Sequence, residues 1–129
     1  MQTVKQDLQL KELPTHIECF DNSNIQGAYP VSACVVFKNA KPSKKEYRLF
    51  NIKEAGNVGD DYAMLKEVMT RRIARLKSAP QNKPDLMIID GGKGHMGVVS
   101  EVLNNANISD IAVNAFSPPD KRLIVVFFL

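Results

Sequence analysis

The sequence predicts an α/β domain, with helices flanking a mixed five-stranded sheet. Two observations carry this prediction. Three short apolar or alternating segments separated by turn residues come first, which is typical of an antiparallel meander. Beyond residue 60 the spacing of apolar residues becomes helical, and two helical segments then alternate with two short apolar runs. Because strand–helix–strand connections require parallel pairing, the sheet must combine both directions.

The composition fits one globular domain: the chain has 129 residues, of which 44% are apolar and 24% charged. Such a chain is long enough to bury a core and is neither disordered nor fibrous. A membrane span needs about 20 apolar residues, whereas the longest unbroken apolar run is Leu123 to Leu129. The first residues lack the apolar core of a secretory signal, and two cysteines do not make a disulfide framework. A reducing cytoplasm is therefore the expected compartment.

The charge balance is mildly basic, at +3, which permits a nucleic-acid partner without arguing strongly for one. Its distribution is more informative than its sum, although each basic cluster is also what an ordinary solvated face contains. The clusters are Lys41, Lys44 and Lys45; Lys66, Arg71, Arg72, Arg75 and Lys77; and Lys121 and Arg122.

The first half of the chain predicts a polar lead-in over residues 1–14 and then three antiparallel strands. Turn residues end each strand, and the second strand is apolar almost throughout, as in a strand covered on both faces. The expected strands are 17–21, 31–37 and 46–52, with turns at 22–27 and 39–43. A turn centred between Gln26 and Gly27 would set Cys19 nearly opposite Cys34, as buried free thiols.

The second half predicts two helices and two further strands. The first helix starts at Asp60 or Asp61 and ends before Pro80, with carboxylates in its first turn and Arg or Lys in its last turns. Its apolar stripe includes one charged residue, Arg72. The remaining expected elements are a strand at 85–90, a glycine turn at 91–94, a helix at 96–106 and a strand at 111–116.

The economical topology puts the first strand in the centre of the sheet. The second and third strands then lie on one side of it, and the fourth and fifth on the other. In this arrangement the first and fourth strands are parallel neighbours, so Asp21 and Asp90 lie side by side at their carboxyl ends. Alternation puts both side chains on one face, at the edge where open α/β sheets bind ligands.

Two carboxylates held about 5 Å apart repel each other. A bound divalent cation usually compensates such a pair, and oxygen ligands suit Mg²⁺ or Mn²⁺. A third acid is available from Asp60 or Asp61. The alternative from spacing alone is structural, because aspartate commonly forms turns and caps helices. His95 is more often a surface helix residue than a ligand, and the glycines before it lack P-loop spacing.

A series of short motifs carries a family resemblance from about Ile17 to about Phe116. The motifs are IECFD (17–21), QG (26–27), EYR (46–48), FNI (50–52), GDDY (59–62), TRR (70–72), PDL (84–86) and IDGGKG (89–94). In this order and with these gaps they closely resemble the C-terminal endonuclease domain of UvrC, the incision subunit of bacterial nucleotide excision repair. The resemblance implies a ribonuclease H-like fold for residues 15–129.

The resemblance also implies a function: metal-dependent hydrolysis of a DNA phosphodiester on the 5′ side of a lesion. Its substrate would be damaged double-stranded DNA, and the full-length family protein would act on a UvrB-DNA complex. The catalytic acids would be Asp21, Asp60 and Asp90, with Asp21 and Asp90 holding Mg²⁺ or Mn²⁺. The candidates for phosphate contact, against structural or solvated-face roles, are then Lys93, Arg71 and Arg72.

The chain departs from the family pattern in two respects. The family's histidine downstream of the fifth strand is missing, since the chain has only His16 and His95, and His95 stands where the family usually has glutamine. The ending over residues 117–129 is also unlike the family. Leu123 to Leu129 would be either an edge strand or a partner contact, or else a truncated or shifted reading-frame end; the second alternative is favoured and implies a domain incomplete at its C-terminus. Three functions stay open: an endonuclease domain, an inactive nucleic-acid-binding or scaffold fragment, and a degenerate fragment without activity.

Overall fold

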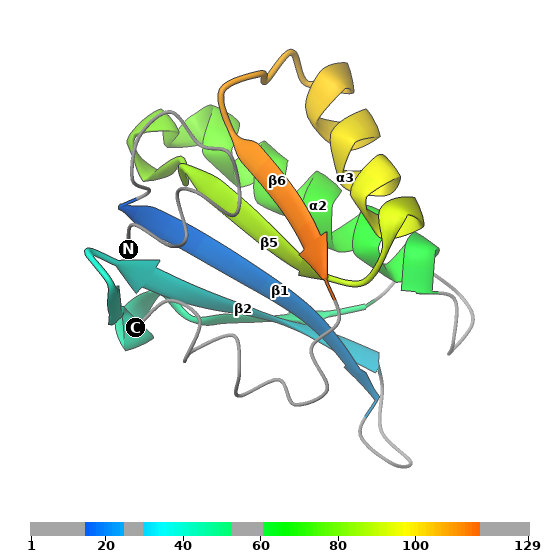
Figure 1. The fold of residues 1–129 in the computed structure, drawn as a ribbon, viewed down its shortest axis with the longest axis horizontal. Helices are drawn as coiled ribbons and strands as arrows, with labels where there is room; N and C mark the ends of the chain where they lie inside the picture. Colours follow the sequence, from blue (N-terminus) through cyan, green and yellow to red (C-terminus); the bar gives the residue numbers. More distant parts are fainter. Residues whose placement is uncertain (1–14, 25–29, 53–60, 117–129) are drawn as a thin grey trace.

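The fold is a mixed sheet with two α-helices on one of its faces (Figure 1). The computed structural model describes residues 15–24, 30–52 and 61–116. The expected lead-in at 1–14 and the segment 117–129 lie outside these ranges. The elements in chain order are β1 (His16–Asn24), β2 (Pro30–Lys38), β3 (Lys41–Pro42), the 3₁₀ turn η1 (Lys44–Glu46), β4 (Arg48–Asn51), α2 (Asp61–Ser78), the 3₁₀ turn η2 (Pro80–Asn82), β5 (Leu86–Asp90), α3 (Lys93–Asn105) and β6 (Ala112–Phe116).

Strand β1 is central, as predicted. The sheet order is β3-β2-β1-β5-β6, and β4 also pairs with β2. The β1–β2 pair is antiparallel, whereas β1–β5 and β5–β6 are parallel. The predicted topology is therefore confirmed, with α2 and α3 as its crossover helices.

Within the described residues the sheet has six strands rather than the predicted five, because the segment expected as one turn contains a short strand. Asn39 and Ala40 both have positive φ angles, of 53° and 65°. Two such residues in succession make the tight hairpin turn that matches strand twist. The chain therefore reverses at once, and Lys41 and Pro42 pair with the end of β2 as β3.

The strand expected at 46–52 is shorter than predicted. Residues 44–46 form η1 instead, and pairing with β2 begins at Arg48. Two hydrogen bonds hold Glu46 in this turn: Lys38 Nζ donates to its Oε1 at 2.7 Å, and Ser43 Oγ donates to its Oε2 at 2.5 Å.

The register of the β1–β2 hairpin corrects the expected cysteine pair. Phe20 faces Cys34, and Cys19 faces Val35. Five residues, 25–29, lie between the last paired positions, Asn24 and Pro30. Because five is an odd number, the pairing is symmetric about position 27 and not about a point between Gln26 and Gly27. Since a one-residue shift reverses faces, Cys34 lies in the core beneath the helices and Cys19 lies in the cluster on the other face. Both are free and buried, as predicted.

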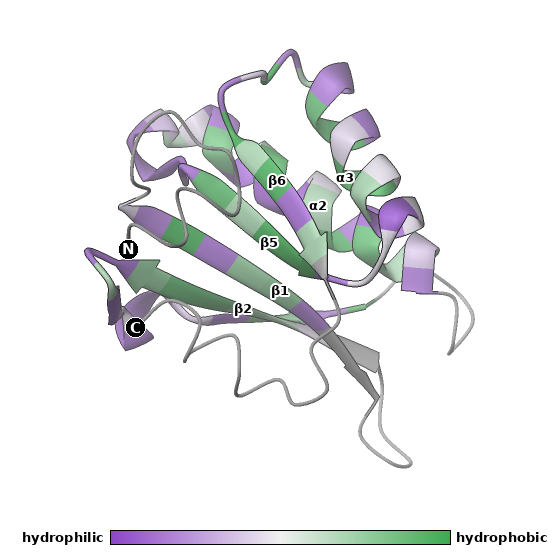
Figure 2. Cartoon of the chain, in the orientation of Figure 1, coloured by the Kyte–Doolittle hydropathy of each residue, from purple (hydrophilic) through white to green (hydrophobic). Residues whose placement is uncertain are grey.

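Apolar side chains form a cluster on each face of the sheet. In Figure 2, β5 and most of β2 are accordingly green, whereas β1 and β6 also carry purple, hydrophilic positions. The larger cluster lies between the sheet and the helices, where Leu65 and Met69 of α2 and Val99 of α3 meet the strands. The smaller cluster contains Ile17, Cys19, Phe37, Leu86 and Ile88. Within the described ranges, no helix combines the length and apolar character that a bilayer crossing requires.

Asp85 joins the start of β1 to the start of β5. Its Oδ2 accepts hydrogen bonds from Thr15 N at 2.9 Å, Thr15 Oγ1 at 2.8 Å and His16 N at 2.9 Å. In return, the Asp85 N–H donates to His16 O at 2.8 Å. These bonds set the parallel register of the two strands that carry Asp21 and Asp90.

Candidate active site

Strands β1 and β5 bring Asp21 and Asp90 side by side, at the point where the pairing of the two strands ends. Their parallel pairing runs from Ile17 with Leu86 to Phe20 with Ile89. Asp21 and Asp90 are the next residues on each strand. Neighbouring strands lie about 4.8 Å apart. Both aspartates are partly exposed.

The two aspartates lie on the face of the sheet opposite the α-helices. Alternation along the strands sets Asp21 on the side of Cys19 and Asp90 on the side of Ile88. Cys19 and Ile88 belong to the smaller cluster, to which the strands alone contribute, whereas α2 and α3 pack on the other face. The carboxylates are therefore approached from the side that neither α-helix covers.

This donor set fits a hard divalent cation, because it presents carboxylate oxygens from two adjacent strands. The third expected acid, Asp60, lies outside the described residues, directly before Asp61, which begins α2. Among the described residues no three His, Cys, Asp or Glu side chains form a metal-binding group. The described part of the chain thus supplies two of the three predicted acids.

A glycine turn leads from Asp90 into α3, which begins earlier than predicted. Lys93 and Gly94, expected in the turn, are the first residues of the helix. The Gly92 N–H donates to His95 Nδ1 at 3.0 Å, and the Met96 N–H donates to Gly92 O at 3.1 Å. This side-chain contact caps the helix and allows it to start directly after the turn. Periodicity of apolar residues could not show this start, because the first turn of α3 is exposed.

Tyr62 lies against the same turn and was not predicted as a site residue. Its ring stands edge-on to that of His95, with 4.8 Å between centroids and 68° between planes. A Cβ on Gly94 would clash with the Tyr62 hydroxyl. The start of α2 therefore packs against the start of α3. The sequence feature that could have indicated this contact is Tyr62 itself, the last residue of the GDDY motif.

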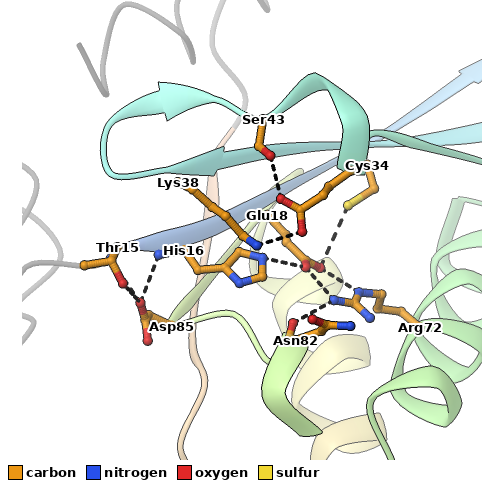
Figure 3. Close-up of polar contacts among 10 residues, drawn as sticks. Thr15, His16, Glu18, Cys34, Lys38, Ser43, Arg72, Asn82 and Asp85 are labelled. Carbon is orange, nitrogen blue, oxygen red and sulfur yellow. Dashed lines mark hydrogen bonds and ion pairs between the residues drawn. The ribbon is translucent and has the colours of Figure 1, made fainter. Parts of the chain in front are cut away.

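Arg72, predicted as a phosphate contact, is instead part of a buried ion pair (Figure 3). Its Nε donates to Glu18 Oε1 at 2.8 Å, and its Nη2 donates to Glu18 Oε2 at 2.6 Å and to Asn82 O at 3.2 Å. Arg72 is 3% exposed and Glu18 is 2% exposed. The guanidinium is therefore inaccessible to DNA, and this corrects the prediction for Arg72.

Glu18 accepts further contacts in this buried cluster. His16 Nε2 lies 3.1 Å from its Oε2, and Cys34 Sγ lies 3.9 Å from its Oε1. Burial alone would raise the pKa of Glu18, but the hydrogen bonds from Arg72 and His16 outweigh it and leave that pKa lowered. Two features of the sequence could have indicated this ion pair. Glu18 is a charged residue within an apolar strand, and Arg72 is a charged residue within the apolar stripe of the helix.

The other two predicted phosphate contacts remain predictions. Arg71 is partly exposed, and its Nη1 donates to Asn51 O at 2.7 Å. Its guanidinium carbon lies 5.3 Å from the centroid of the Phe50 ring. Lys93 is exposed on the first turn of α3, next to the glycine turn.

Comparison with known proteins identifies the family. The family model for the UvrC RNase H endonuclease domain matches residues 5–122. The chain is 48% identical over 129 residues to UvrABC system protein C of Christiangramia forsetii, covering 99% of this chain and 21% of that protein. It is 53% identical over 122 residues to UvrABC system protein C of Bacteroides fragilis, covering 95% of this chain and 20% of that protein. The chain thus spans about a fifth of the length of these relatives.

Solved structures agree on the fold. Endonuclease V of Ciona intestinalis, in complex with a 24mer DNA containing an inosine followed by a ribo-adenosine, superposes with a TM-score of 0.55 at 15% identity. The match covers 98% of this chain and 63% of that one. At this identity the likeness bears on the fold alone, which is the ribonuclease H-like mixed sheet expected from the sequence. The family model, which matches residues 5–122, shows that the chain belongs to the UvrC RNase H endonuclease domain family.

Proposed function

We propose that this chain is a divalent-metal-dependent DNA endonuclease domain that makes the 5′ incision in nucleotide excision repair. The observation that carries the proposal is the placement of Asp21 and Asp90 on neighbouring strands, directly after the last paired residues of β1 and β5, on the face that α2 and α3 leave open. Family membership supports it, since the relatives are named UvrABC system protein C. The endonuclease V that shares the fold was solved with DNA bound.

The proposed roles follow from the donor chemistry of the residues. Asp21 and Asp90 hold Mg²⁺ or Mn²⁺, and Asp60 completes the acidic cluster or orients a water. A divalent cation held there supplies a Lewis acid that activates water and neutralises charge on the scissile phosphate. Lys93 and Arg71 add positive charge that offsets repulsion between the carboxylates and the DNA backbone.

The proposed substrate is damaged double-stranded DNA. With a net charge of +3 the chain itself holds DNA weakly. We therefore propose that a UvrB-DNA complex brings the domain to its substrate, so that local concentration replaces affinity.

A nicking assay tests the enzyme proposal. Damaged duplex DNA is incubated with Mn²⁺ and the wild-type protein, Asp21→Asn or Asp90→Asn. Asp110→Asn is the matched control, because Asp110 is an exposed carboxylate paired with Lys83, before β6. We expect both site variants to lose about 100-fold or more in rate, the usual scale for removing one electrostatic contact to the transition state, and the control to keep its rate. Equal rates for wild type and Asp21→Asn contradict the proposal.

A catalytically inactive nucleic-acid-binding or scaffold domain is the second candidate. The observation in its favour is that His95, directly after the Asp90 turn, departs from the family pattern, which usually has glutamine at this position. Calorimetric titration with Mn²⁺ separates the candidates when combined with the nicking assay. Binding that Asp90→Asn abolishes, without nicking above the Asp21→Asn background, supports the inactive domain.

A further inference from the structure

His95 lies at the third position of α3, where its side chain can reach back to the residue that precedes the helix. That residue, Gly92, is extended, with φ −115° and ψ −158°. Its N–H donates to His95 Nδ1 at 3.0 Å. This is half of a capping box, the arrangement in which a side chain at the third helical position accepts from the N–H of the cap residue. Because Nδ1 accepts, the neutral ring carries its proton on Nε2.

The ring of His95 also packs directly on the turn after Asp90. A Cβ built on Gly91 would clash with the ring at Cγ and Nδ1, whereas a Cβ on Gly92 would meet nothing. The absence of a side chain at Gly91 therefore lets the ring lie against the backbone one residue after Asp90. The hydrogen bond and this packing together fix the path of the turn.

The His95 ring also contacts a residue of α2, Tyr62. The Tyr62 ring stands edge-on to the His95 ring, at 4.8 Å, and the Tyr62 hydroxyl lies over Gly94. Tyr62 is the second residue of α2 and follows Asp61. His95 thus links the turn that leaves Asp90 to the first turn of the helix that follows Asp60 in the sequence.

We propose that His95 is a positioning residue of the nuclease site. It holds the Gly91–Gly92 turn by accepting from Gly92, which fixes the direction in which Asp90 leaves β5. Its second contact, with the Tyr62 ring, holds the start of α2 against that turn but does not act on Asp90. The assignment rests on the proposed function of Asp90 as a metal ligand. His95 acts through Asp90 and does not itself touch the metal or the DNA.

Three substitutions separate the two contacts of His95. His95→Gln keeps a side-chain acceptor, since glutamine is itself a capping-box residue, but loses the ring. His95→Phe keeps a ring for Tyr62 but loses the acceptor, and His95→Ala loses both. Asn104→Ala, at an exposed position near the other end of α3, is the control for a substitution in the helix that leaves the site untouched.

The first readout is the Mn²⁺ affinity of each protein by calorimetry, with thermal unfolding to show that each variant is folded. Outer contacts that orient a metal ligand typically contribute about 10- to 100-fold in affinity. We expect His95→Phe and His95→Ala to bind Mn²⁺ about 10-fold more weakly, and His95→Gln and Asn104→Ala to stay near wild type. Unchanged affinity in His95→Phe, or a loss in His95→Gln as large as in His95→Phe, overturns the positioning role.

The second readout needs no metal: amide hydrogen exchange by NMR at Gly92. One hydrogen bond has a net worth of about 1 kcal/mol, so its loss speeds exchange by about fivefold. We expect faster exchange at Gly92 in His95→Phe, but not in His95→Gln. If the wild-type protein binds no Mn²⁺, or Asp90→Asn leaves binding unchanged, the proposed function fails. The positioning role in a nuclease site then fails with it, and exchange decides only whether His95 holds the turn; equal exchange rates in all the proteins overturn that contact as well.

Discussion

Arg72 of α2 and Glu18 of β1 form a two-pronged ion pair buried between the helix and the centre of the sheet, with N–O distances of 2.8 and 2.6 Å. The planar guanidinium matches the two carboxylate oxygens, which makes this the strongest geometry for such a pair. Asn82 O accepts the second bond of Arg72 Nη2, and His16 contacts Glu18. The central strand, α2 and η2 are thereby joined at one point.

Breaking this pair on one side will destabilise the fold strongly. We expect Glu18→Gln to lower the free energy of unfolding by about 3–5 kcal/mol, because it leaves the Arg72 charge buried without its counterion. Replacing both partners, as Glu18→Leu with Arg72→Met, will recover most of that loss. Urea unfolding gives the free energy of unfolding of the wild-type protein and of both variants. Glu46→Gln, which breaks the more exposed pair with Lys38, is the control and will cost at most about 1 kcal/mol. A loss in Glu18→Gln no larger than in this control contradicts the prediction.

Stability will fall in acid partly through Glu18. Burial raises the pKa of Glu18, but the hydrogen bonds from Arg72 and His16 outweigh it and hold the pKa below its usual 4.5. A carboxyl group with a lowered pKa in the folded state contributes stability above its unfolded pKa, and that contribution is lost as the pH falls through the folded value. Urea midpoints measured from neutral pH to below about pH 4 will therefore drop more steeply in wild type than in Glu18→Gln. Parallel curves for the two proteins rule out this role for Glu18.

Two glycines in α3 will respond differently to alanine. Nothing lies near a Cβ built on Gly97, so Gly97→Ala will stabilise the protein by about 0.5–1 kcal/mol through the lower entropy of the unfolded chain. A Cβ on Gly94 meets the hydroxyl end of Tyr62, which must swing away from His95. Gly94→Ala will therefore gain less than Gly97→Ala or lose stability. Thermal unfolding compares them, and the same gain at both positions means that Tyr62 does not hold this contact.

The two thiols will be unreactive in the native protein. Burial, together with the charge of Glu18, raises the pKa of Cys19 to about 12 and also raises that of Cys34. Thiolates are the reactive form, so a disulfide reagent at neutral pH will label the protein only as fast as it unfolds. In denaturant both thiols will react at once. Rapid labelling of either thiol in buffer contradicts their burial. Since the thiols lie on opposite faces of the sheet, oxidation will not join them.

The placement of Asp21 beside Asp90 could be predicted from the sequence. Crossover helices require parallel strands, and a meander requires antiparallel ones, so few topologies remain. The register of the β1–β2 hairpin could not be predicted in the same way, because it depends on whether the loop holds an odd or an even number of residues. The odd number of loop residues determines which face of the sheet Cys19 and Cys34 each lie on.

The role of Arg72 could not be predicted from its neighbours in the sequence. Arg71, Arg72 and Arg75 together resemble a solvated basic face, and the partner of Arg72 is 54 positions away. Only its place in the apolar stripe of α2 indicated burial. The contacts of His95 are of the same kind: the partner of its ring, Tyr62, belongs to another helix.

The parallel pairing of β1 with β5 has a consequence for how the molecule folds. It joins residues far apart in the chain, such as His16 and Asp85, which are 69 positions apart. Pairings of this kind form late, because the entropy of closing the long loop must be overcome before the contacts are gained. The β1–β2 hairpin can form soon after synthesis, but Asp21 meets Asp90 only when β5 docks. A partly folded chain therefore carries no assembled carboxylate pair, and the site arises together with the native sheet.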